Sequence, residues 1–379
     1  MEINVLSRRA FISATSLGLA LPTWASLAFA NNEKPDWLAS AFTDNNGVHF
    51  MAVSDTKGQF HWSLPLPARA HAPLIHPSHG IVAIVARRPG FFIDIIDVSS
   101  GQRLNRIEPL AEHHFYGHGL FSADGRLLIT QENHYPSGAG KIFVREWQTG
   151  KIVHEWSSYG IGPHESHLLN KDVLVVANGG LKTHPDNDRR ILNLDDMVPN
   201  IAFISLKDGA LIQRIEHKDA LHQLSIRHLA VNDKQQVAFG CQHNGPAWED
   251  MPLVGVLLQQ NAQPSLHYLP MPEAIRQAFK QYCGSVCFDA SGEILAVSSP
   301  RGGLVAYWHL PSLSFLASAH YRDVCGLSST KNAHEFYLTT GRGQLIKTNP
   351  IADVSQLIQK FDNKKWDNHL QRINTQIIL

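Results

Sequence analysis

The sequence predicts an all-β protein, a seven-bladed β-propeller with a short C-terminal helix. Three observations lead to this fold. The chain consists of short apolar runs separated by turns, one strand–turn–strand unit recurs about seven times, and its spacing is close to the ~40–50 residues of a propeller blade. The alternatives are a β-sandwich or two stacked barrels, and neither of these needs such self-similar units.

The recurring unit is clearest at residues 120–130 and 286–297. In these segments an Asp-Gly or a Ser-Gly pair separates two apolar runs. Such pairs predict a tight turn between antiparallel strands. Weaker copies of the unit lie at residues 39–53, 74–86, 167–177, 228–240 and 327–339.

Helical periodicity is confined to two segments, residues 272–282 and 353–370, and the second is the predicted C-terminal helix. The longest irregular stretch is 180–200, and a loop of this length in a compact domain is usually functional or mobile. We expect it to cover the mouth of the channel or to pack on the next blade. The N- and C-terminal segments are expected to pair and close the ring.

The first 30 residues have the order of an export signal. The Arg8-Arg9 pair precedes an apolar run over residues 11–21, and a small-x-small cleavage site ends at Ala30. Adjacent arginines before Phe-Ile are typical of the twin-arginine route, which exports folded proteins; a Sec signal is the alternative. We therefore expect a signal peptide at 1–30, one propeller domain at 31–379, and a periplasmic location.

Composition narrows the classes of function. Lys+Arg and Asp+Glu are equal at 33 each, so nothing favours nucleic acid as a partner. Hydrophobic residues make up 44% and charged residues 17%, which is typical of a compact domain. No second apolar run is long enough to span a bilayer after cleavage, and we expect a monomer. The chain has no C-x-x-C-H haem motif and no nucleophile elbow.

The 22 histidines are the compositional feature that points to a metal ion. In a propeller, the loops that enter the first strand and leave the second strand of each blade share one face. His118, His164 and His228 lie at the start of the first strand in three successive units, so we expect them to meet at one end of the channel. With Glu165 they are the predicted ligands of iron, copper or zinc, and a purely structural role for each is the alternative.

Alternation along a strand predicts that only one residue of each neighbouring pair faces the channel, either His164 or Glu165 and either Arg227 or His228. Arginines on the same face predict an anion site with paired donors. Glu132 and Asn178, in nearby loops, carry oxygen ligands of the kind that hard cations such as Ca²⁺ prefer. The candidate ligand-binding residues are Arg227, Arg301, Arg342, Glu132, Asn178 and His184.

The four cysteines have no zinc-type spacing. We expect one disulfide or buried thiols. Cys283 and Cys325 occupy matching positions in consecutive units, so a disulfide between them, or one with Cys287, is the candidate pairing.

Several motifs, in this order, resemble the family catalogued as domain of unknown function 1513. They are Arg88-Pro89-Gly90, Gly117-His118-Gly119, Gly162-Pro163-His164-Glu165, Ala177-Asn178-Gly179-Gly180, Thr183-His184-Pro185, Ser225-Ile226-Arg227-His228 and Ser299-Pro300-Arg301-Gly302. The resemblance covers nearly the whole mature chain. It implies a twin-arginine-exported, WD40/YVTN-like propeller of the periplasm, and it assigns no catalytic residue.

The resemblance also implies a role near iron uptake or periplasmic redox handling. Members of the family are often encoded beside imelysin-type iron-regulated proteins and a di-haem oxidoreductase, which are therefore the implied partners. We favour a binding module for a metal ion or an iron complex over a metal-dependent enzyme, such as a lactonase-like hydrolase or an oxidoreductase. A protein-docking platform without a small ligand is the third hypothesis.

Overall fold

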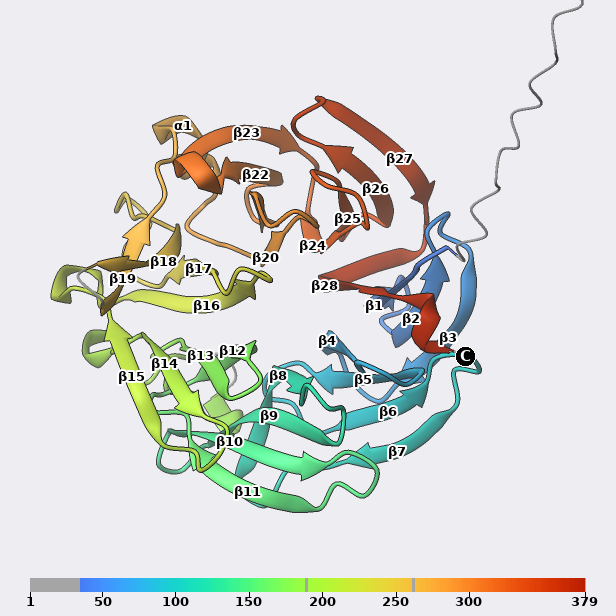
Figure 1. Cartoon of the computed structure of the whole chain (residues 1–379), viewed down its shortest axis with the longest axis horizontal. Helices are drawn as coiled ribbons and strands as arrows, with labels where there is room; N and C mark the ends of the chain where they lie inside the picture. Colours follow the sequence, from blue (N-terminus) through green and yellow to red (C-terminus); the bar gives the residue numbers. More distant parts are fainter. Residues whose placement is uncertain (1–34, 188–189, 261–262, 379) are drawn as a thin grey trace, which may run out of the picture. The chain divides into compact units, whose positions relative to one another are not determined.

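The computed structural model describes residues 35–187, 190–260 and 263–378. These residues form seven four-stranded antiparallel sheets, arranged as blades around a central axis (Figure 1). The predicted seven-bladed all-β fold is confirmed. The expected signal peptide at 1–30 lies outside the described residues. Within the described part of the chain, no helix is long and apolar enough to cross a membrane.

The blades follow one another along the chain, and each runs from its innermost to its outermost strand. The first three complete blades are β4 (Ala70–Ile75), β5 (Ile81–Ala86), β6 (Ile93–Asp97) and β7 (Arg103–Ile107); β8 (His113–Phe121), β9 (Leu127–His134), β10 (Ala139–Glu146) and β11 (Ile152–Ser157); and β12 (Pro163–Asn170), β13 (Val173–Asn178), β14 (Asn200–Ser205) and β15 (Leu211–Glu216). The next three are β16 (Leu224–Val231), β17 (Val237–His243), β18 (Val254–Gln260) and β19 (Gln263–Tyr268); β20 (Ser285–Phe288), β21 (Ile294–Ser299), β22 (Leu304–His309) and β23 (Ser314–His320); and β24 (Val324–Ser329), β25 (Phe336–Thr340), β26 (Gln344–Asn349) and β27 (Val354–Lys360).

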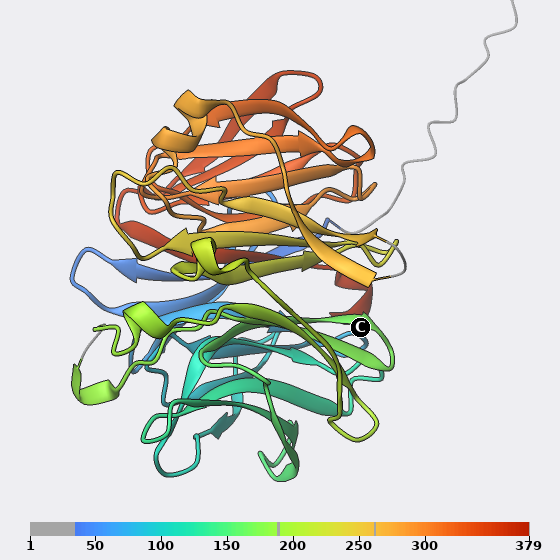
Figure 2. The same ribbon diagram turned by 90° about the vertical axis from the view of Figure 1, so that its left-hand side faces the viewer.

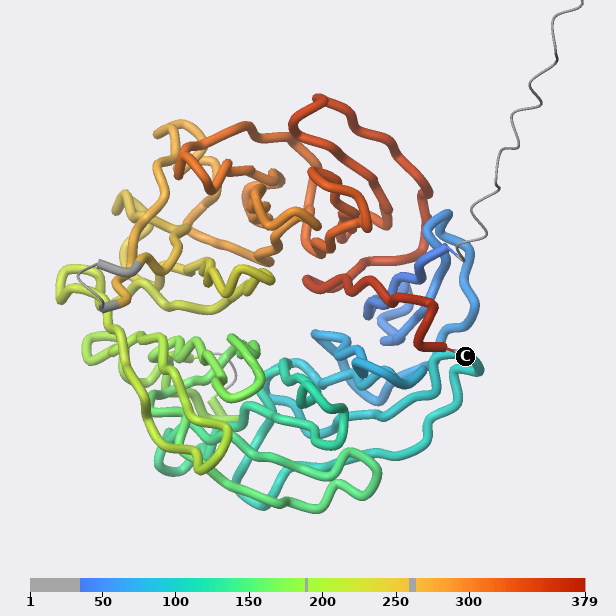
Figure 3. The backbone as a smooth tube through the Cα atoms, in the orientation of Figure 1, coloured from blue at the N-terminus to red at the C-terminus, as the bar shows by residue number. Residues whose placement is uncertain are grey.

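The seventh blade closes the ring with strands from both ends of the described chain. Its order from the axis outwards is β28 (Lys364–Ile373), β1 (Trp37–Asp44), β2 (His49–Asp55) and β3 (Phe60–Leu66). Trp37 of β1 pairs with Ile373 of β28. Figure 3 shows the last strand, in red, beside the first strands, in blue. The expected closure is confirmed.

The predicted helix over residues 353–370 is wrong. This segment forms β27 and most of β28, and a 3-10 turn, η5 (Thr375–Ile378), follows. The spacing of its apolar residues also suits a helix. The backbone groups on the axial side of β1 must be hydrogen-bonded, however, and β28 pairs with them as a strand. For the same reason, the unit at 39–53 forms the second and third strands of its blade rather than the first and second.

Short helical turns lie in the connections between strands. The predicted helix at 272–282 is present as α1 (Glu273–Ala278). The 3-10 turns in the connections are η1 (Pro185–Asn187), η2 (Leu194–Asp196), η3 (Asp219–Leu221) and η4 (Leu310–Ser312). We call the side on which the chain enters the innermost strands the front face and the other side the back face. Figure 2 shows α1 on the front face, at the left, and the C-terminus on the back face.

The apolar core lies between neighbouring blades. The second strands β5 and β21 are buried along their whole length because a blade covers each of their faces. The outermost strands β15 and β27 are largely exposed. The innermost strands differ from both, because their buried positions include many polar side chains. Polar residues are buried in a native protein where they have partners or a function, so these side chains indicate a functional site at the propeller axis.

Candidate metal centre

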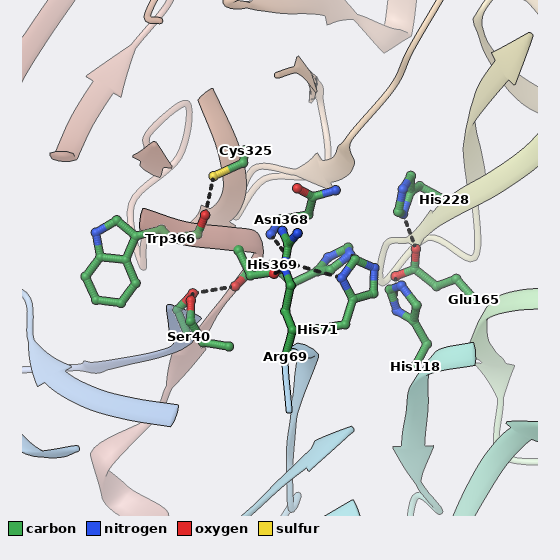
Figure 4. Close-up of polar contacts among 12 residues, drawn as sticks. Ser40, Arg69, His71, His118, Glu165, His228, Cys325, Trp366, Asn368 and His369 are labelled. Atoms are coloured by element: carbon green, nitrogen blue, oxygen red, sulfur yellow. Dashed lines mark hydrogen bonds and ion pairs between the residues drawn. The ribbon is translucent and has the colours of Figure 1, made fainter. Parts of the chain in front are cut away.

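Five buried histidines and one glutamate meet at the propeller axis. They come from the innermost strands of five blades: His71 on β4, His118 on β8, His164 and Glu165 on β12, His228 on β16 and His369 on β28. Figure 4 shows the rings of His71, His118 and His369 close together, with Glu165 and His228 beside them.

The innermost strands that carry these residues are all irregular at the site. The pairing of β8 with β9 shifts register between Phe115 and Gly119, that of β12 with β13 at His164, and that of β16 with β17 at Arg227. The pairings of β4 and β28 shift in the same way. The pairing of β20 with β21 has no such shift, and β20 supplies none of the six residues.

A β-bulge changes the direction of the side chains around it, so neighbours can point to the same side of a strand. The donor atoms of His164 and Glu165 belong to one cluster, and Arg227 and His228 line one cavity. The prediction that only one residue of each pair faces the channel is therefore wrong, because it assumed a regular strand.

The first donor set is His118, His164, Glu165 and His228. One donor atom from each lies within 4.8 Å of all the others. Glu165 is central: its Oε2 lies 3.1 Å from Nδ1 of His228, and its Oε1 lies 3.6 Å from Nδ1 of His118. The structure thus brings together the four residues that the sequence predicts as metal ligands.

A second donor set shares His118 with the first. It consists of His71, His118 and His369, whose donor atoms also lie within 4.8 Å of one another. The Nε2 atoms of His71 and His369 are 3.2 Å apart. On the other edge of its ring, Nδ1 of His71 is hydrogen-bonded to Oδ1 of Asp367, at 2.9 Å. The two sets together form one continuous group of nitrogen and oxygen donors.

Burial favours the neutral form of four of the five imidazoles. It lowers the pKa of His118, His164 and His369 well below the usual value, and it lowers the pKa of His71 to about 4. Burial alone would raise the pKa of Glu165, but its contacts with His118, His167 and His228 hold it well below its usual value. These four histidines therefore favour the neutral state of a nitrogen donor, and Glu165 favours the ionised carboxylate.

Two nitrogen atoms of this centre have no hydrogen-bond partner among the described residues, namely Nε2 of His118 and Nδ1 of His164. Both side chains are buried. A buried polar atom without a partner is costly, so native structures rarely leave one. A bound cation would satisfy both atoms, because the lone pair of a neutral imidazole is a metal ligand.

Two cavities lead to the centre from opposite faces. The front cavity has a volume of about 460 Å³, and its lining includes His164, His228, Arg227 and Arg301. Leu181 and Ile191 of the long irregular segment also line it, on the side of the β13–β14 connection. The back cavity has a volume of about 410 Å³, and its lining includes Glu165 and His369.

The other candidate ligand residues lie outside the lining of the front cavity. Glu132 is buried in an ion pair with Arg145, at 2.6 Å. The Nδ2 atom of Asn178 donates hydrogen bonds to the carbonyl of Ser158 and to Oδ1 of Asn200, which fastens the ends of β13 and β14. These contacts give Glu132 and Asn178 structural partners, so the structure does not bring them to the centre.

His184 and Arg342 also lie away from the centre. The ring of His184 packs against that of Tyr135, and its Nδ1 accepts a hydrogen bond from the backbone of Asp186. Arg342 is exposed, and its carbonyl accepts a hydrogen bond from Lys360. Of the six candidate ligand-binding residues, only Arg227 and Arg301 line the front cavity.

Three residues of the centre, His71, Asp367 and His369, are not among those predicted from the sequence. His71 stands at the head of an innermost strand, as His164 does, so the same rule would have found it had the strand been traced back beyond Leu74. The sequence does not place Asp367 and His369 at the axis, because the apolar spacing of residues 353–370 predicts a helix. Once β28 is known to be an innermost strand, both residues are expected at the axis.

All four cysteines are free thiols, so the candidate disulfide is absent. Cys241, Cys283 and Cys325 are buried, and Cys287 is half-buried. Burial raises the pKa of Cys283 and Cys287 to about 12, so these thiols stay protonated and pack as small apolar side chains.

Comparisons with known proteins concern the fold and the family. No curated protein matches the sequence. Hydrazine synthase of Kuenenia stuttgartiensis has a similar fold, with a TM-score of 0.57 and 13% identity over 84% of this chain and 94% of that chain. At this identity the similarity shows the propeller fold alone. A family model described as "Protein of unknown function (DUF1513)" matches residues 64–373, and the chain therefore belongs to the DUF1513 family.

Proposed function

We propose that this protein is a binding module that holds one transition-metal ion on the propeller axis. The ligands are His118, His164, His228 and Glu165. The observation that carries the proposal is that donor atoms from three consecutive innermost strands lie within 4.8 Å of one another. Three imidazoles and one carboxylate form a donor set that suits zinc, iron and copper.

The electrostatics of the centre support a divalent cation. Burial favours the neutral form of His118 and His164, and the ionised Glu165 is the negative ligand. The unpartnered nitrogens of His118 and His164 are two positions at which a cation would replace a missing hydrogen bond. His167 donates from behind to Oε1 of Glu165, at 3.2 Å, which orients the carboxylate.

The position of the donors supports a preorganised binding site. Every proposed ligand stands on a β-strand, and each of these strands is hydrogen-bonded to the next strand of its blade. Sites on such elements hold their geometry better than sites on loops. The twin-arginine pattern at Arg8-Arg9 supports export of the folded protein to the periplasm, where we propose that it acts.

The direct test is the metal content of the purified full-length protein. We expect about one equivalent of metal by mass spectrometry after isolation or after loading with Zn²⁺. The single substitutions His118→Ala, His164→Ala and His228→Ala should each remove it. His114→Ala is the matched control, because His114 is a buried histidine of the same strand as His118 and belongs to neither donor set. A parent protein that stays metal-free after loading would refute the proposal.

A further inference from the structure

The front cavity is strongly cationic. Five arginines line it, and no aspartate or glutamate occurs among its described lining residues. Arg69 is neutralised by Asp367. For Arg88, Arg227 and Arg301, no carboxylate of the described chain lies within ion-pair distance. Uncompensated charges of one sign in a concave site attract a ligand of the opposite sign.

Of Arg88, Arg227 and Arg301, only Arg227 is buried. The residue is 9% exposed, and its Nε has no hydrogen-bond partner among the described residues. Gly179 packs closely against this side chain and leaves room for it because it has no Cβ. A Cβ at Gly179 would lie 3.2 Å from Cδ of Arg227. A buried guanidinium without an acceptor is costly, so the fold maintains it here for a ligand that supplies the acceptor.

Two tyrosines contact the guanidinium groups of Arg88 and Arg301. The guanidinium of Arg88 lies over the ring of Tyr116, at 5.7 Å, and that of Arg301 lies over the ring of Tyr282, at 4.3 Å. One nitrogen of Arg88, Nη1, is also buried without a partner. Stacked arginines are restrained in orientation and still present their donors at the edge, which suits paired binding of a carboxylate.

The arginines and the proposed metal ligands border the same space. His164 and His228 line the front cavity together with Arg227, which is the sequence neighbour of His228. We propose that the front cavity binds a small multivalent carboxylate, with one carboxylate held by Arg227, Arg88 and Arg301 and another on the metal ion. The contact between the first carboxylate and the arginines does not depend on a metal ion. The contact between the second carboxylate and the metal ion rests on the proposed function. The protein would then bind a metal–carboxylate complex rather than a bare ion.

The test is calorimetric titration of malonate into the metal-free and the Zn²⁺-loaded full-length protein. Malonate should bind to both forms, and more tightly to the loaded one. Arg227→Gln and Arg301→Gln should each weaken binding about 10-fold or more while zinc content stays unchanged. Arg301 is exposed, so its variant is expected to fold even if that of Arg227 does not. Arg342→Gln is the matched control, since it removes the same charge from the same face but outside the cavity.

The two proposals fail in different ways. A protein that binds malonate through Arg227 and never binds zinc refutes the metal site and the contact between a carboxylate and the metal ion, but it supports the arginine site. A protein that binds zinc and shows no malonate affinity, or the same affinity in the parent and both cavity variants, refutes the present inference. Acetate binding as tightly as malonate would refute the requirement for two carboxylates, and tighter binding of phosphate would refute the carboxylate assignment.

Discussion

The Nδ1 atom of His71 lies 2.9 Å from Oδ1 of Asp367, a residue that comes from the opposite end of the propeller sequence. The ionised carboxylate can only accept, so Nδ1 of His71 carries the proton and its Nε2 carries the lone pair. That Nε2 points towards His369, at 3.2 Å. The strand that closes the ring therefore also orients a histidine of the second donor set, as carboxylates do behind metal-bound histidines.

His71 is not one of the four proposed ligands and acts only through His118, which belongs to both donor sets, so we expect Asp367→Asn to lower the affinity for Zn²⁺ by less than the about 10-fold typical of a direct ligand's partner. An amide presents both a donor and an acceptor to His71, so the ring loses its fixed tautomer and its charged partner. Affinity is measured by competition with a chromophoric chelator. Asp124→Asn is the control, because Asp124 pairs with the exposed Arg126 at a turn on the back face. A loss of about 10-fold or more would show that His71 itself binds the metal ion, which would contradict the proposed set of four ligands.

Gly117→Ala should disturb the centre through His71. Gly117 has a φ of 102°, and a Cβ added to it would lie 2.8 Å from Cδ2 of His71. Gly47→Ala is the control, since Gly47 has a φ of 83° and no atom within 4 Å of the added Cβ. We expect Gly117→Ala to lose about 1–3 kcal/mol more unfolding free energy than Gly47→Ala in urea titrations. Equal losses would mean that only the backbone conformation matters and that the ring of His71 can move away.

The fold was predictable because each blade repeats the same local pattern, an apolar run, a tight turn and a second apolar run. The chain end was not predictable in this way. Residues 353–370 have apolar spacing that also suits a helix, and only the unpaired edge of β1 decides between the two. Long-range pairing of this kind leaves no mark on a local pattern.

The site was predictable as far as regular geometry applies. The position of the innermost strand in each unit was enough to bring His118, His164 and His228 to one place. The orientation of the side chains was not predictable. A bulge turns both His164 and Glu165 into the cluster, and a bulge cannot be recognised in a single sequence. Glu132 was misjudged because its partner Arg145 lies on the adjacent strand, which becomes apparent only once the strands are paired.

Replacing both Arg8 and Arg9 by lysine should block export and leave folded, uncleaved protein in the cytoplasm. The physical basis is recognition of the paired arginines ahead of Phe11 by the twin-arginine route. Cell fractionation and the mass of the N-terminal fragment provide the measurement. Normal delivery of the double variant to the periplasm would assign the signal to the Sec route instead.

The metal-free protein should lose stability as the pH falls from 7 to 5, in part because histidines outside the donor sets are buried in their neutral form. Burial lowers the pKa of His114 and of His217 to about 4, whereas an unfolded chain takes up these protons near pH 6.5. A folded-state pKa below the unfolded value means that the unfolded state binds more protons between these limits, so stability is present above pH 6.5 and is lost as the pH falls towards 4.

Each such histidine should contribute at most about 2 kcal/mol to the difference in unfolding free energy between pH 7 and pH 5. His217→Gln should therefore reduce that difference, while an amide at this position can still interact with the hydroxyl of Tyr268, which lies 2.6 Å from Nδ1 of His217. Urea titrations at the two pH values, in the presence of a chelator, provide the measurement. His320→Gln is the control, because His320 is exposed. If His217→Gln keeps the full pH dependence of the parent, then His217 is protonated alike in the folded and unfolded states, and its burial does not set its pKa.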